Sequence, residues 1–175
     1  MECFEICLYY NSRYSMNRIT IFISITIFSI FVGSQITEGC LLVPYWQSLD
    51  ADEFYQYYIN FGPAINGFYT ILTIASVLIS VGTSVFCYFR KSPAFRFSLV
   101  SSVFALLIIV LFYAYFKGIN QQFYQSAFQE DELSAVLKTW KLLHWIRVAI
   151  ELVSFGFLLK AFDILHGERN LEATS

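Results

Sequence analysis

The sequence predicts an all-α integral membrane protein, a bundle of four transmembrane helices with a short amphipathic helix in its first extracytoplasmic connection. Three observations indicate this class. The 175-residue chain is 57% hydrophobic and 19% aromatic. Only 14% of its residues are charged, against roughly 25% in an ordinary soluble domain. Its apolar stretches are also long enough to cross about 30 Å of hydrocarbon, which takes about 20 helical residues.

The predicted spans divide the chain into a membrane domain, residues 19–165, and two cytoplasmic tails. The spans are residues 19–38, 67–89, 97–118 and 142–165, and the tails are residues 1–18 and 166–175. In the uncharged tract around the second span, Pro63 is expected to break the helix because proline removes a backbone donor. For the first span, the alternative is a cleaved signal peptide over Ile19 to Gly33, although no clear small-residue cleavage site follows it.

The distribution of Lys and Arg predicts the orientation. Basic residues precede the first span, fill the second connection and follow the fourth span: Arg13, Arg18, Arg90, Lys91, Arg96 and Arg169. The first connection, residues 40–66, contains none. Short cytoplasmic loops keep an excess of Lys and Arg, so both termini are expected to face the cytoplasm. The lack of Asn-X-Ser/Thr sites and of a cysteine pairing pattern favours a bacterial inner membrane.

Two connections carry helix-start signals. Asp50 can cap a short helix in the first connection, with Glu53 three residues later as the partner of a capping box. The aromatic face of this helix is formed by Phe54, Tyr57, Tyr58 and Phe61. That face either rests on the membrane, covers the bundle, or gates a substrate site. Acidic residues at 130–132 suit a helix N-terminus, so the fourth helix is expected to begin outside the membrane.

The fourth span carries a polar stripe. Spacings of four, three, four and three residues place on one helical face Trp140, His144, Arg147, Glu151 and Ser154. Lipid offers no partner for a guanidinium, a carboxylate or an imidazole. The stripe is therefore predicted to face the interior of the bundle.

The predicted topology brings polar residues of the other spans to the same outer depth as this stripe. They include Gln35, Glu38, Tyr69, Thr70 and Asn120. The inner half offers mostly small and apolar side chains, as close helix packing requires. The sequence therefore predicts an outward-opening polar pocket, with Asn120, Tyr69, Thr70 and Trp140 as substrate-binding residues.

The polar cluster has two main interpretations. In one, Arg147 and Glu151 pair at i, i+4 and are joined by Glu38, so that an ionic lock holds the helices in register. In the other, His144 exchanges a proton, Arg147 holds an oxyanion, and Glu38 or Glu151 orients the imidazole. Such a set suits proton abstraction next to a carbonyl or from a phenol.

A third interpretation is a metal centre. One His and two carboxylates could bind iron or manganese, but the ExxH pair of di-iron bundles and the second in-membrane His of a bis-His haem site are missing. No metal ligands are therefore assigned. Phosphate loops and the GxSxG and HExxH motifs do not occur. A net charge of −2 without a basic stripe excludes nucleic acid as an expected partner.

Short motifs in residues 19–165 resemble those of a known family. They are Thr37-Glu38-Gly39 after Gly33, Leu41-Leu42-Val43-Pro44, Asn120, and Trp140-Lys-Leu-Leu-His144-Trp145-Ile-Arg147. The chain is similar in these to small four-span membrane proteins, grouped as a domain of unknown function, that include the fungal anthrone oxygenases. The resemblance implies oxidation of an anthrone to an anthraquinone by molecular oxygen without a tightly bound cofactor. It implies that a base forms a phenolate or enolate, and it points to His144, Arg147, Asn120 and Glu38.

Two functions follow as expectations. One is a cofactor-independent oxidoreductase acting on a hydrophobic aromatic or quinone-like molecule, with His144, Arg147, Glu38 and Glu151 as catalytic residues. The other is a non-catalytic membrane protein that binds a lipid, a quinone or a partner protein, with the polar cluster as a structural lock. No cofactor is assigned, and a metal or a quinone remains an open alternative.

Overall fold

The computed structural model describes residue 16 and residues 18–174, with side chains described up to residue 170. Every element in this part of the chain is helical. The elements are α2 (Arg18–Thr37), the π-helical segment η1 (Glu38–Leu42), α3 (Val43–Trp46), α4 (Ala51–Arg90), α5 (Phe95–Leu111), the π-helical segment η2 (Phe112–Phe116), α6 (Lys117–Tyr124) and α7 (Glu130–Thr174). The predicted N-terminal tail lies largely outside the described residues.

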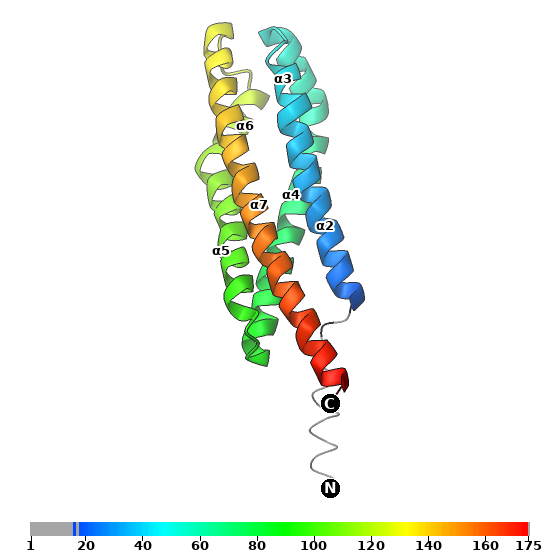
Figure 1. Ribbon diagram of the computed structural model, residues 1–175. Helices are drawn as coiled ribbons and strands as arrows, with labels where there is room; N and C mark the ends of the chain where they lie inside the picture. Colours follow the sequence, from blue (N-terminus) through cyan, green and yellow to red (C-terminus); the bar gives the residue numbers. More distant parts are fainter. Residues whose placement is uncertain (1–15, 17, 175) are drawn as a thin grey trace.

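The elements form helical rods that alternate in direction along one axis (Figure 1). The rods are α2–η1–α3, α4, α5–η2–α6 and α7. The α5 helix packs against both α4 and α7, and α2 also contacts α4 and α7. Three rods are long and apolar enough to cross a membrane: Arg18–Trp46, Ala51–Arg90 and Phe95–Tyr124.

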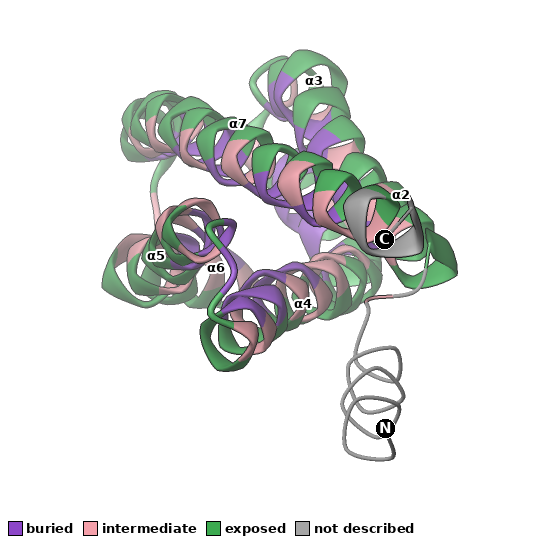
Figure 2. Ribbon diagram, turned by 60° about the horizontal axis from the view of Figure 1, so that its bottom comes forward, coloured by how far each residue is buried: buried purple, intermediate pink, exposed green. Residues whose placement is uncertain are grey.

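The rods expose many large apolar side chains and bury several small polar ones. Exposed positions include Ile71, Leu78 and Val110, whereas Ser101 and Ser154 are fully buried. Figure 2 shows exposed and buried faces alternating around each rod. The outward faces of a water-soluble helix bundle carry mostly polar and charged residues instead.

Small residues hold one half of the structure together. The Ser101 hydroxyl oxygen lies 3.2 Å from the hydroxyl oxygens of both Ser80 and Ser154, and Ser154 also donates to the Ser101 carbonyl oxygen at 2.9 Å. These serines connect α4, α5 and α7. Small side chains let the three helices approach closely. Nearby, the rings of Phe28 and Phe155 stack with their centroids 5.1 Å apart.

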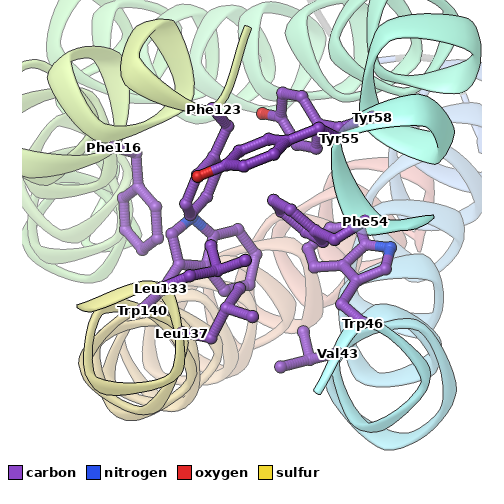
Figure 3. Close-up of a cluster of buried hydrophobic side chains, with 10 residues drawn as sticks. All are labelled: Val43, Trp46, Phe54, Tyr55, Tyr58, Phe116, Phe123, Leu133, Leu137 and Trp140. Atoms are coloured by element: carbon purple, nitrogen blue, oxygen red, sulfur yellow. The ribbon is translucent and has the colours of Figure 1, made fainter. Parts of the chain in front are cut away.

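An aromatic cluster fills the opposite end (Figure 3). It joins α3, the start of α4, η2, α6 and α7 through Val43, Trp46, Phe54, Tyr55, Tyr58, Phe116, Phe123, Leu133, Leu137 and Trp140. The Tyr55 hydroxyl donates to the Phe128 carbonyl oxygen at 2.9 Å and accepts from its backbone N–H at 3.1 Å. Of the aromatic face expected after Asp50, Phe54 and Tyr58 therefore cover the bundle, while Phe61 is exposed.

The expected helix break at Pro63 is wrong. The α4 helix runs unbroken from Ala51 to Arg90, so the short amphipathic helix is its first part and not a separate element. Proline removes one backbone hydrogen bond, but side-chain contacts hold α4 on both sides of it. Tyr58 packs against Phe123 on one side, and the Asn66 amide donates to the Tyr124 hydroxyl on the other.

Both predicted helix starts are observed. The Asp50 carboxylate accepts from the Glu53 N–H at 2.8 Å, and the Glu53 carboxylate accepts from the Asp50 N–H at 3.4 Å, which completes the capping box. The α7 helix begins at Glu130 with three acidic residues in its first turn. It continues to Thr174, beyond the residue 165 at which the fourth span was expected to end.

We expect Gly62→Ala to be less stable than Gly67→Ala. A Cβ at Gly62 would lie 2.8 Å from the Tyr124 hydroxyl oxygen, whereas one at Gly67 meets nothing within 4 Å. Alanine favours a helix over glycine by about 1 kcal/mol, so Gly67→Ala should raise the melting temperature. Melting temperatures of both variants in detergent test this, and an equal gain would contradict the close packing of α4 on α6.

Candidate functional site

The polar stripe of α7 faces the interior, as predicted. Trp140, His144, Arg147, Glu151 and Ser154 are all buried. The helix turns this face toward α2 and η1 at the level of Arg147, and toward α5 at the level of Ser154. Exposure of these polar side chains to lipid would carry a high free-energy cost. Their burial against other helices avoids that exposure.

Arg147 is the centre of the network. Its Nη2 atom lies 2.6 Å from the Gln35 side-chain oxygen, 2.8 Å from Nδ1 of His144 and 3.1 Å from the Glu38 carboxylate. The two hydrogens on Nη2 are shared among these three acceptors. Glu38 is the first residue of η1, and Gln35 lies one turn earlier in α2. The buried Arg147–Glu38 ion pair therefore joins α7 to the first rod.

Both ring nitrogens of His144 are engaged. The imidazole is fully buried, and Nε2 lies 2.9 Å from the Gln35 carbonyl oxygen. A guanidinium can only donate, so Nδ1 accepts from Arg147 and Nε2 carries the hydrogen that is donated to Gln35. His144 is neutral in this arrangement, and its ring stacks on Trp140 with centroids 5.2 Å apart. It contacts Arg147 and does not line the cavity described below.

The two π-helical segments shape the site. Glu38 begins η1, and Phe116 ends η2 with its ring centroid 4.7 Å from the guanidinium carbon of Arg147. A π-helical turn inserts an extra residue and redirects side chains, and such turns are frequent at functional sites. At Gly39, an added Cβ would lie 2.9 Å from the Trp145 ring and 3.0 Å from the His144 ring. Glycine therefore permits the close approach of η1 to α7.

A cavity of about 200 Å³ adjoins the network between α4 and α5–η2–α6. Six of the eight predicted site residues line it: Glu38, Tyr69, Thr70, Asn120, Trp140 and Arg147. Apolar residues also line it, including Ile65, Ile108, Ile109 and Phe112. Two further lining residues, Ile74 and Tyr113, are 52% and 64% exposed. The cavity therefore reaches the apolar outer surface between α4 and η2.

Several cavity residues are held by hydrogen bonds. The Trp140 indole N–H donates to the Asn120 side-chain oxygen at 3.2 Å, which links α7 to α6. The Tyr69 hydroxyl donates to the Ser34 carbonyl oxygen at 3.0 Å, which links α4 to α2. These bonds fix the side chains of Trp140, Asn120 and Tyr69 without a ligand. Side chains that are already fixed lose less conformational entropy when a molecule binds.

Glu151 lies outside both the network and the cavity lining. The expected i, i+4 pair with Arg147 is not formed, because Arg147 pairs with Glu38. Neither carboxyl oxygen of Glu151 has a hydrogen-bond partner within the described part of the chain. The polar contacts around Arg147 are therefore made by a different set of residues from the one expected: Gln35, Glu38 and His144.

Sequence reasoning placed Gln35 at the right depth but assigned it no role. It contributes its side-chain oxygen to Arg147 and its carbonyl oxygen to His144. The i, i+3 spacing of Gln35 and Glu38 was the available signal, because it places both on one helical face. Trp46 and Phe116 were also missed, since aromatic residues are frequent throughout this chain and carry no distinguishing pattern.

The described residues do not group three or more His, Cys, Asp or Glu side chains in a way that could hold a metal ion. Comparison of the chain with protein families, curated proteins and solved structures finds no match. The similarity to the anthrone oxygenase-like family therefore rests on the short motifs alone.

We expect Arg147→Met to lower the free energy of unfolding by about 3–5 kcal/mol, because it leaves the buried Glu38 carboxylate without its partner. The double variant Arg147→Met with Glu38→Gln should recover part of this loss, since no unpaired charge remains. Lys160→Met is the control, because Lys160 forms an exposed pair with Asp163 that is worth about 0–1 kcal/mol. Denaturant unfolding in detergent measures all three, and equal effects of Arg147→Met and Lys160→Met would contradict the lock.

Proposed function

We propose that the chain is an integral membrane protein whose four rods all cross the bilayer, with both termini in the cytoplasm of a bacterial cell. Three rods have the required length and composition. The fourth, α7, buries its polar stripe and exposes Leu142, Ile146 and Leu152. Such exposed apolar side chains suit lipid contact. The basic residues before α2, between α4 and α5 and near the end of α7 support the orientation.

Reporter fusions test this topology. Alkaline phosphatase is active only outside the bacterial cytoplasm, so we expect activity when it is fused after Ala127, between α6 and α7, and none when it is fused at the C-terminus. A fluorescent protein that folds only in the cytoplasm should give the reverse pattern. Activity of the same reporter at both positions would contradict four crossings.

We further propose that the cavity binds a hydrophobic molecule that carries an oxygen-bearing ring. The observation that carries this proposal is the composition of the lining: it contains the buried Arg147–Glu38 ion pair, and much of the remainder is apolar. Ligand sites are typically apolar with a few polar groups that fix orientation. A carbonyl or phenolate oxygen on the ring would accept from the Arg147 guanidinium.

The size of the cavity narrows the class of ligand. An engineered apolar cavity of about 150 Å³ holds benzene, so about 200 Å³ accommodates a single ring with small substituents. Any larger part must leave past Ile74 and Tyr113 onto the lipid-facing surface. A single-ring quinone or phenol with an apolar tail meets both conditions, because the bilayer would solvate the tail.

Oxidoreductase chemistry is the second candidate function. It is favoured by the presence of Glu38 and Arg147 in the same lining. A carboxylate can accept the proton of a phenol, and a guanidinium can stabilise the resulting oxyanion. With a hydroquinone as substrate, transfer of two electrons and two protons to molecular oxygen would give the quinone and hydrogen peroxide. The anthrone oxygenase resemblance likewise implies molecular oxygen as the oxidant. On this scheme His144 positions Arg147 through its Nδ1 atom and does not itself contact the substrate.

We expect Ile109→Phe to weaken binding of a decyl-tailed benzoquinone about tenfold or more, because the larger side chain occupies the cavity. Val110→Phe is the matched control, since Val110 lies next in α5 and is exposed. Protein in lipid nanodiscs is titrated with the quinone, and binding is followed by quenching of tryptophan fluorescence, because Trp46 and Trp140 line the cavity. Equal Kd values for the two variants would place binding elsewhere. If the protein consumes oxygen when the corresponding hydroquinone is added, the result would support oxidoreductase activity.

A further inference from the structure

Glu151 is a buried carboxyl group that neither the network nor the cavity uses. Its side chain is 0% exposed, and both carboxyl oxygens lack a hydrogen-bond partner among the described residues. An ionised carboxylate in such surroundings is strongly disfavoured unless it is paired with a cation. Isolated as it is here, Glu151 is favoured as a neutral carboxylic acid.

The charged groups that act on Glu151 come from two elements. They are Arg147, one turn earlier in α7, and Glu38 in η1. At the next turn of α7, the groups contributed by the neighbouring helices are hydroxyls, because Ser154 meets Ser101 of α5 and Ser101 meets Ser80 of α4. One cation therefore serves two carboxyl groups, and it is paired with Glu38.

We propose that Glu38, Arg147 and Glu151 form a proton-binding unit in which the two carboxyl groups share one negative charge and one proton. In the observed arrangement Glu38 carries the charge and Glu151 carries the proton, so the unit is neutral. This proposal rests on the polar network and does not depend on which ligand enters the cavity.

The geometry provides a second arrangement for the same unit. Glu151 stands four residues after Arg147, a spacing at which helical side chains reach each other. The Arg147 Nε–H is buried and has no hydrogen-bond partner among the described side chains. When the proton moves from Glu151 to Glu38, Arg147 loses its pair with Glu38 and gains one with Glu151. The unit stays neutral in both arrangements.

Infrared spectroscopy of the full chain in lipid tests the proposal, because a protonated carboxyl in an apolar site gives a carbonyl-stretch band separate from the amide bands. We expect this band at neutral pH in the unmodified protein. Glu151→Gln should lose it. Glu38→Gln should lose it as well, because Glu151 then ionises to pair with Arg147. Glu130→Gln, which alters an exposed carboxylate, should keep it.

Three outcomes would overturn the proposal: no band in the unmodified protein, a band that persists in Glu151→Gln, or a band that persists in Glu38→Gln. Helical circular dichroism and the melting temperature establish that each variant is folded. Should Glu151→Gln fail to fold, Glu151→Asp replaces it, and there the band must shift in frequency. An unshifted band would assign the proton to another group and equally reject the proposal.

Discussion

The structure depends on the burial of the Arg147 guanidinium. A charged side chain inside an apolar assembly must be paired, and removal of its partners costs far more than loss of an exposed ion pair. Arg147 obtains its partners from Gln35 and Glu38, so its contacts join α7 to the first rod. Gly39 permits this contact, because any larger residue would meet the rings of His144 and Trp145.

Glu38 and Arg147 form an ion pair between two rods and also line the cavity, and these two positions are compatible. Gln35 and His144 contact Arg147 from within the protein, whereas Glu38 and Arg147 also line the cavity. Gln35 and His144 therefore orient the guanidinium, whereas Glu38 and Arg147 are the charged groups that a molecule in the cavity would contact. A buried ion pair is weak evidence for net stabilisation, because desolvation offsets its attraction.

The rest of the fold positions this cavity. The aromatic cluster closes one end of the structure, and the serine contacts draw α4, α5 and α7 together at the other. Between them, η1 supplies Glu38 and η2 supplies Phe112 and Phe116. The cavity thus lies at the depth where both π-helical segments interrupt regular helix geometry.

The sequence alone determined the helical class, the capping box at Asp50, the start of α7 at Glu130 and the inward face of its polar stripe. These features are local, since caps, charge and helical periodicity depend on residues within a few positions of one another. It also placed Glu38, Tyr69, Thr70 and Asn120 at the same level along the bundle axis as Arg147. Successive helices run in opposite directions, so the position of a residue within its helix predicts this level without knowledge of any contact.

Only the tertiary structure decided which carboxylate pairs with Arg147. Glu151 at i+4 and Glu38 on another rod are equally acceptable partners by residue type, and the choice depends on how closely η1 approaches α7. The continuity of α4 through Pro63 was decided in the same way, because contacts with α6 on both sides offset one lost hydrogen bond. Partner choice and helix continuity depend on packing between distant segments, and local sequence patterns do not encode the distances involved.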